Sequence, residues 1–444
     1  MKSIRIGGGA GYSGDRIDPA VRLLKEGKLD YIVFECLAER TIALAQKRKQ
    51  QDSDLGYDPL LTERFHAILS LAVLHKVKII TNMGAANPLS AAKEVQKIAA
   101  GLGISGLKIA TVTGDDVLEM VLQQPNLPVI ENDQQVQDYR DRIISANAYL
   151  GCEPIVLALA EGADVVITGR VADPALFLAP LVYEFNWEMN NYQLLGKGTL
   201  VGHLMECAAQ VCGGYFADPG KKEIPALWDI GFPIAVVDEK GNGNITKVDG
   251  TGGLVNVATC TEQLLYEIHD PANYITPDCI ADFSKVTFNE IQPNQVSFQS
   301  AAGKAPTEDF KVSIGYQNGF LATAEMSYGS TGCTERARLA EEIIRRRLIY
   351  LEQSIRNLTI DLIGYNALHG LAPVKEPSEV RLRVCGLVDD YKVAQTIVHE
   401  VEALYTNGPA GGGGATKTIE EQVSVVSILL PKNVVKTSLI YYET

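Results

Sequence analysis

The sequence predicts an α/β fold, with an N-terminal doubly wound parallel-sheet domain followed by a second, α+β domain. Through the first half of the chain, short apolar runs alternate with helical patterns, as they do in βαβ units. These runs are apolar throughout, which is typical of strands covered on both faces. After about residue 225, short strands separated by Gly, Pro and Asn replace this pattern. We therefore expect domains at residues 1–224 and 225–444.

The first domain is expected to contain five strands with helices between them. The strand-like runs cover residues 3–6, 31–34, 77–81, 107–112 and 163–168. The first helix is expected to begin at Asp18, because Pro19 then occupies the first helical position, where a missing N–H costs nothing. Further helical patterns cover residues 40–51, 59–74, 88–102, 147–161 and 199–212.

The second domain is expected to combine short strands with two long helices. Its strand-like runs cover residues 233–237, 245–248, 285–288, 295–299, 311–314, 320–326, 358–363 and 380–384. Helical patterns cover residues 335–357 and 391–405. Two glycine-rich segments, 328–334 and 408–414, are open to two interpretations, as anion-binding loops or as plain turns.

Composition excludes several classes of protein. The formal net charge of −14 over 444 residues argues against binding to nucleic acid or to anionic membranes. The apolar runs are too short to span a bilayer, and the first residues lack a signal-peptide core, so we expect a cytoplasmic protein. None of the eight cysteines forms a CxxC pair or stands at metal-ligand spacing with a His. Buried thiols are therefore expected, and no metal site.

Polar residues follow every expected strand of the first domain. Because the carboxyl ends of parallel strands meet at one edge of a sheet, where ligands bind, we predict a site there. Caps and plain turns are the alternative for each loop taken alone. The candidate residues, strand by strand, are Gly9, Gly11, Asp15 and Arg16; Glu35; Asn82 and Asn87; Gly114 and Asp115; and Thr168, Arg170 and Asp173.

The first glycine loop matches the dinucleotide fingerprint in form. It contains Gly9-x-Gly11-x-x-Gly14, and Glu35 follows at the end of the second strand. The expected helix begins only at Asp18, whereas the fingerprint places its last glycine inside the helix. We therefore expect the loop amides, with Asp15 and Arg16, to face a smaller substrate, and NAD or FAD binding remains an alternative.

Arg170 and Asp173 are the pair expected to carry the chemistry. An arginine at a strand end can clamp a carboxylate or phosphate with two hydrogen bonds. Asp173 is interpreted either as an acid–base group or as the cap of the next helix. His203 lies three residues before Glu206 on a helical pattern, and is either a general base or a hydrogen-bonding His between domains. The candidates for proton transfer are Asp173, Asp115, His203 and Glu35.

Four segments resemble the acyclic terpene utilisation AtuA-like family. They read IGGGAGYSGD at 6–15, DYIVFECLAERT at 30–41, TNMGAANP at 81–88 and ITGRVAD at 167–173. The resemblance extends from residue 1 to about 430 and implies bacterial breakdown of branched acyclic terpenoid acids through CoA thioesters. It carries over no catalytic residues. Some relatives have a further small C-terminal domain, so we expect that domain to be missing or to be supplied by a small partner subunit.

The function expected from these observations is a lyase or hydratase acting on a small carboxylic acid or an acyl-CoA. Arg170 would hold the carboxylate, and the glycine-loop amides would stabilise an enolate-like oxygen. The alternatives are a nucleotide-dependent oxidoreductase and a non-catalytic subunit that acts with a partner chain. No cofactor is assigned, and a homo-oligomer is expected.

Overall fold

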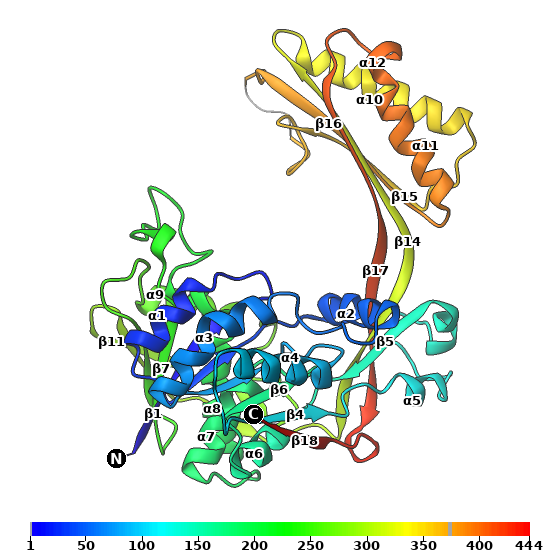
Figure 1. Ribbon diagram of the computed structural model, residues 1–444. Helices are drawn as coiled ribbons and strands as arrows, with labels where there is room; N and C mark the ends of the chain where they lie inside the picture. The colour runs from blue at the N-terminus through cyan, green and yellow to red at the C-terminus, as the bar shows by residue number, and fades with distance from the viewer. Residues whose placement is uncertain (1, 372–374) are drawn as a thin grey trace. The chain divides into compact units, whose positions relative to one another are not determined.

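A computed structural model describes residues 2–371 and 375–444, which form two compact units (Figure 1). The first unit comprises residues 2–315 and 425–444, and the second comprises residues 316–424. The expected boundary at residue 225 lies inside the first unit. There β1 (Ser3–Ala10) pairs antiparallel with β7 (Pro233–Asp238), so one sheet joins the two expected domains.

A ten-stranded mixed sheet organises the first unit, in the order β11-β12-β8-β7-β1-β2-β3-β6-β4-β18. Its five central strands, β1, β2, β3, β6 and β4, are parallel, as the apolar runs predicted. Antiparallel strands flank them on both sides, which makes the sheet mixed rather than wholly parallel. The strands are β2 (Tyr31–Phe34), β3 (Lys78–Thr81), β4 (Lys108–Thr113), β6 (Val165–Thr168), β8 (Gly243–Lys247), β11 (Thr287–Gln292), β12 (Gln295–Gln299) and β18 (Ser438–Glu443).

Helices lie on both faces of the central strands (Figure 1). On one face α1 packs against α3 and α3 against α4, and on the other α6 packs against α7 and α7 against α8. The strands between them are fully buried, which explains their uninterrupted apolar sequence. The helices are α1 (Asp18–Glu26), α2 (Glu39–Gln51), α3 (Leu61–His75), α4 (Pro88–Gly101), α5 (Leu118–Leu122), α6 (Glu153–Ala160), α7 (Ala175–Phe185), α8 (Tyr192–Met205) and α9 (Val257–Leu265).

Two predicted elements of this unit differ from the structure. The strand expected at residues 3–6 continues to Ala10, so Gly7, Gly8 and Gly9 belong to β1 and not to a loop. The helix expected at 147–161 is the end of β5 (Ile143–Ala148) followed by α6. A small antiparallel sheet, unnoticed in the sequence, is formed by β9 (Tyr274–Ile275), β10 (Ile280–Asp282) and β13 (Ala302–Lys304).

Helix α8 approaches its neighbours closely because it contains glycine. A Cβ atom added at Gly196 would overlap the carbonyl oxygen of Ala302 in β13. A Cβ at Gly202 would come within 2.5 Å of Pro174 Cα, just before α7. We expect Gly196→Ala to destabilise the protein, because overpacking a close contact typically costs about 1–3 kcal/mol.

Equilibrium urea unfolding of the Gly196→Ala protein tests this expectation. Tryptophan fluorescence is a suitable signal, because the two tryptophans, Trp187 and Trp228, both lie in the first unit. Gly101→Ala is the matched control. Gly101 ends α4 with nothing near its missing Cβ, so this change should be neutral or stabilising by about 0.5–1 kcal/mol. Equal effects of the two changes would contradict the packing argument.

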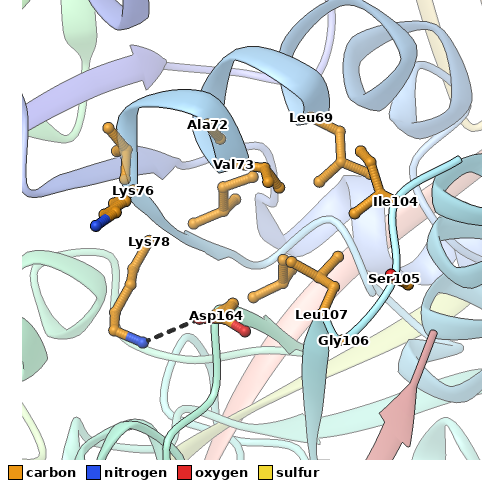
Figure 2. A pocket seen from close by; sticks show the side chains of 13 residues that line it. Leu69, Ala72, Val73, Lys76, Lys78, Ile104, Ser105, Gly106, Leu107 and Asp164 are labelled. Atoms are coloured by element: carbon orange, nitrogen blue, oxygen red, sulfur yellow. Dashed lines mark hydrogen bonds and ion pairs between the residues drawn. The ribbon is translucent and has the colours of Figure 1, made fainter. Parts of the chain in front are cut away.

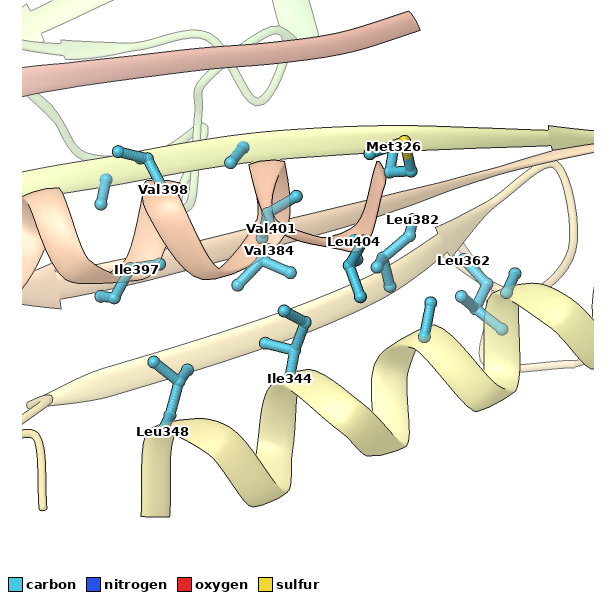
Figure 3. Close-up of a cluster of buried hydrophobic side chains, with 14 of the residues drawn as sticks. Met326, Ile344, Leu348, Leu362, Leu382, Val384, Ile397, Val398, Val401 and Leu404 are labelled. Atoms are coloured by element: carbon cyan, nitrogen blue, oxygen red, sulfur yellow. The ribbon is translucent and has the colours of Figure 1, made fainter. Parts of the chain in front are cut away.

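The second unit is a four-stranded antiparallel layer covered by helices. Its strand order is β15-β16-β14-β17, and β14 and β17 continue into it from the first unit. Buried and less buried residues alternate along β16, as expected for a strand with one face against a core. Figure 3 shows Ile344 and Leu348 of α10, with Ile397 and Val401 of α11, around Val384 of β16. The elements are β14 (Asp309–Gly329), β15 (Asn357–Ile363), β16 (Glu379–Val388), β17 (Gly413–Pro431), α10 (Cys333–Tyr350), α11 (Tyr391–Glu402) and α12 (Leu404–Asn407).

Candidate active site

The loop after β6 is fixed by a buried carboxylate. Oδ2 of Asp115, which follows β4, accepts hydrogen bonds from the Arg170 backbone N–H and from Asn147 Nδ2, both at 2.9 Å. Burial raises the pKa of Asp115 to about 6, while these donors oppose the shift. Asp115 therefore holds the backbone of the neighbouring strand end in place.

The guanidinium group of Arg170 is buried and fully engaged with the protein. Its Nε donates to Val171 O at 2.9 Å, and its Nη atoms donate to Leu37 O and to Asp173 Oδ1. It also stacks over the Tyr149 ring, 4.4 Å from the centroid. Burial opposes its charge, but Asp173 and the other acids around it raise the pKa of Arg170. The arginine is therefore a fixed cation that orients Asp173.

Glu35, at the end of β2, is a buried carboxyl group beside this pair. Its Oε1 accepts hydrogen bonds from Leu37 N–H and from Asn82 Nδ2, both at 2.9 Å. The other end of the Asn82 amide, Oδ1, accepts from Cys36 N–H at 2.7 Å. Burial, followed by the negative charge of Asp173, raises the pKa of Glu35 well above its usual range. Glu35 is therefore harder to ionise than an exposed glutamate.

Asp173 opens onto a cavity of about 360 Å³ within the first unit. Its side chain remains 38% exposed, whereas that of Arg170 behind it is 1% exposed. The cavity is large enough for a small organic molecule. Its lining residues are Tyr149, Ala172, Asp173, Pro174, Tyr274, Ile275, Thr276, Pro277, Thr307, Asp309, Lys311 and Leu429.

Lys311 and Tyr149, which both contact Glu39, form a second polar cluster at the wall of this cavity. Lys311 Nζ lies 3.3 Å from Glu39 Oε1 and 4.9 Å from the centre of the Tyr149 ring. The Tyr149 hydroxyl donates to the same Glu39 oxygen. Burial opposes ionisation of Glu39, but the Tyr149 hydrogen bond and the nearby cations lower the pKa of Glu39 to about 2. Glu39 thus stays ionised and holds Lys311 and Tyr149 at the cavity wall.

His203 and Glu206 share one proton across a hydrogen bond. Nε2 of His203 lies 3.1 Å from Leu264 O, an atom that can only accept, so Nε2 carries a hydrogen. Nδ1 lies 2.9 Å from Glu206 Oε1, so a second proton belongs to either the imidazole or the carboxyl group. The His203 ring lies 5.1 Å from that of Tyr274, which lines the cavity. Burial raises the pKa of Glu206 to about 7, with Asp173 adding to the shift.

Comparison with known proteins agrees with the four sequence segments. Residues 4–441 match a family model described as acyclic terpene utilisation family protein AtuA. The chain belongs to the AtuA family. No curated protein and no solved structure gives a significant match.

In this AtuA family member, several predicted site residues lie together and others do not. Glu35, Asn82, Asp115, Arg170 and Asp173 form the connected group just described. Thr168 is buried beside them and donates only to Gly169 O, at 3.0 Å. His203 joins the group through Tyr274 and through the charge of Glu206 rather than at a strand end.

The glycines of the first loop lie in close contact with neighbouring groups. A Cβ at Gly9 would come within 2.5 Å of the Phe34 ring, and one at Gly11 within 2.5 Å of the Cys207 carbonyl carbon. The Gly11 N–H donates to Asp15 Oδ2 at 2.9 Å. The exposed Arg16 donates to Trp228 O at 3.0 Å. The Gly11 amide is therefore occupied within the protein, which counts against the dinucleotide alternative.

Two further candidates hold loops in place. Asn87 caps α4 by accepting from Ser90 N–H, and its Nδ2 donates to Ser53 O and Leu55 O at 2.8 and 2.7 Å. Gly114 has φ +110° and lies against the backbone of Lys436, which precedes β18. Neither of these residues lines the cavity.

No sequence pattern groups Tyr149, Glu39 and Lys311, because they come from three distant segments. A buried arginine in α3, Arg64, was also missed. Its Nη2 donates to Ser13 O and Asp15 O at 3.3 and 3.1 Å, so it anchors the loop after β1. Among the described residues no cluster of His, Cys, Asp and Glu could hold a metal ion. None of the helices in the described part of the chain combines the length and the apolar composition of a membrane-spanning segment.

Proposed function

We propose that this AtuA family member is a lyase or hydratase that acts on a small branched carboxylic acid or its CoA thioester at the Asp173 cavity. Membership of the family supports a role in acyclic terpene utilisation. The observation that carries the chemistry is the orientation of Asp173: a buried arginine holds one oxygen, while the side chain stays open to the cavity.

Asp173 is suited to moving a proton next to a carbonyl group. Arg170 holds Oδ1, and the described residues show no hydrogen-bond donor to Oδ2, which can therefore accept a proton from substrate. Removal of that proton leaves negative charge on the substrate carbonyl oxygen, and this charge needs a nearby cation. Loss of a group from the next carbon completes elimination, and the reverse sequence adds water across a double bond.

In this proposal, Lys311 is the cation that binds the carboxylate or thioester carbonyl of the substrate. Its side chain is 46% exposed and lines the cavity, whereas the hydrogen bonds of Arg170 all point into the protein. The carboxylate or thioester carbonyl would lie beside Lys311, and the Tyr149 ring would form the wall beneath it. Arg170 then acts as a positioning residue for Asp173 rather than as the carboxylate clamp that its sequence context suggested.

Solvent deuterium incorporation tests this proposal without knowledge of the natural substrate. The purified protein is incubated in D₂O with branched unsaturated acids and with their CoA thioesters, and mass spectrometry follows both deuterium uptake and the gain or loss of water. Asp173→Asn is expected to lower the rate at least about 100-fold, because general acid–base catalysis typically contributes that much. Lys311→Met is expected to raise KM.

Asp133→Asn provides the matched control, because Asp133 is exposed and is not a lining residue of the cavity. It should leave the rate unchanged. A wild-type rate in the Asp173→Asn protein would overturn the assignment of Asp173. If turnover appears only after a native cell extract is added, the protein is not active alone. That result would favour a subunit that acts with a partner chain.

A further inference from the structure

A second cavity, of about 340 Å³, lies at the opposite edge of the central strands (Figure 2). Lys78 begins β3, Val165 begins β6, and Leu107 directly precedes β4. The Asp173 cavity adjoins the carboxyl ends of the same parallel strands, so the two cavities are separate. Nothing in the proposed reaction uses the second one.

The walls of this cavity are apolar along most of its length. Leu69 and Val73 come from α3, and Ile104 and Leu107 from the segment between α4 and β4. Figure 2 shows these four side chains pointing into the same space. Val73 is 42% exposed, so apolar surface is left open to water here. Burial of such surface by an aliphatic chain is favourable.

The charged lining residues lie at one end of the cavity. Lys76, Lys78 and Asp164 are there, away from Leu69 and Ile104 (Figure 2). The Asp164 carboxylate is already engaged, since Oδ1 pairs with Lys78 Nζ at 3.4 Å and Oδ2 accepts from Lys108 N–H at 3.0 Å. Lys78 also donates to Ala163 O at 2.6 Å. Lys76 Nζ has no hydrogen-bond or ion-pair partner among the residues that the structure describes.

The position of Lys76 is set by the end of α3. It adopts the left-handed conformation, with φ 56°, and its N–H donates to the carbonyls of Ala72 and Val73. The carbonyl groups at the helix end disfavour an anion there. The positive charges of Lys76 and Lys78 outnumber the single negative charge of Asp164 and favour an anion. The local balance is positive on a chain whose formal net charge is −14. An anion is therefore the charged group that this end of the cavity selects.

We propose that this cavity binds a small amphipathic carboxylate, with its aliphatic chain between α3 and the segment before β4 and its carboxylate beside Lys76. Such a ligand matches both the apolar walls and the unpaired cation. The proposal is independent of the reaction at Asp173, because the two cavities share no lining residue.

Calorimetric titration with octanoate tests this proposal, with octan-1-ol as a neutral probe of the same chain length. Octanoate is expected to bind at one saturable site and to raise Tm. Val73→Trp should abolish binding by filling the cavity from an exposed position. Lys76→Gln should weaken octanoate binding about two- to fivefold, the range for one exposed ion pair, and leave octan-1-ol unaffected.

Lys93→Gln is the matched control, because Lys93 is an exposed lysine of the neighbouring helix α4 that does not line the cavity. It should bind octanoate as the wild type does. Octanoate binding that survives Val73→Trp would overturn the proposal, as would the absence of saturable binding. A wild-type dimer that dissociates on Val73→Trp, with no octanoate binding, would also overturn it and assign the cavity to an interface between copies.

Discussion

Arg170→Met is expected to lower the free energy of unfolding by about 2–5 kcal/mol, because each buried acceptor left without its donor costs about 1–3 kcal/mol. The methionine fills much of the arginine volume but leaves Leu37 O and Val171 O without their donor. It also leaves Asp173 and Glu35 without the nearby cation whose charge favours their ionised forms. Urea unfolding followed by tryptophan fluorescence measures the loss.

A double-mutant cycle separates the ion pair from the rest of the arginine. Asp173→Asn should lower the free energy of unfolding by less than Arg170→Met does. Asp173 is partly exposed, and an asparagine oxygen can still accept a hydrogen bond from the arginine. The double variant should cost less than the sum of the two single changes. Arg40→Met is the control, since Arg40 is exposed in the same unit. This change should alter the free energy of unfolding by no more than about 0.5 kcal/mol. Additive effects would contradict a coupled pair.

The edge of the sheet that carries the site could be predicted because it depends on local sequence. Glu35, Asn82, Asp115 and Arg170 each follow an apolar run, and the strands that precede them are parallel neighbours. Any parallel pairing of those strands brings their carboxyl ends to one edge. The hydrogen bonds from Asn82 to Glu35 and from the Arg170 backbone to Asp115 realise that prediction in the structure.

The first glycine loop shows why some of the site could not be predicted. The spacing of Gly9 and Gly11 matches a phosphate-binding loop. In the structure, a Cβ atom at Gly9 would overlap the Phe34 ring, and one at Gly11 would overlap the Cys207 backbone. Cys207 lies nearly two hundred residues further along the chain, and spacing within a loop carries no information about it. Residue 225 lies inside the first unit for the same reason, since the pairing of β1 with β7 is a long-range contact.

The Asp173 cavity itself also depends on contacts between distant segments. Tyr149 follows β5, Lys311 lies in β14, and β5 pairs with β14 in the sheet. Neither segment shows a polar pattern that sets it apart from an ordinary strand. The sequence therefore pointed to Arg170 for the substrate carboxylate, and Lys311 emerges only once the strands are paired.

The proton shared by His203 and Glu206 should make stability fall as pH rises above about 6.5, the ordinary pKa of a histidine. Burial lowers the pKa of His203, but Glu206 raises it by more, so the folded protein keeps a proton that the unfolded chain releases. The stabilisation is therefore fully present below pH 6.5 and is lost as pH rises through the folded-state pKa. Each unit of upward shift is worth about 1.4 kcal/mol.

The double variant His203→Gln/Glu206→Gln isolates this contribution, because neither glutamine titrates while both keep amide donors and acceptors. The difference in free energy of unfolding between wild type and variant, measured in urea at pH 6.5, 7.5 and 8.5, should shrink at each step. Asp173 and Glu267, whose charges also act on Glu206, are present in both proteins. A difference that stays constant across this range would show that no proton is held between Nδ1 and Oε1. Nitrogen chemical shifts of His203 in the wild type should then show a neutral ring, with its single hydrogen on Nε2 facing Leu264 O and none on Nδ1.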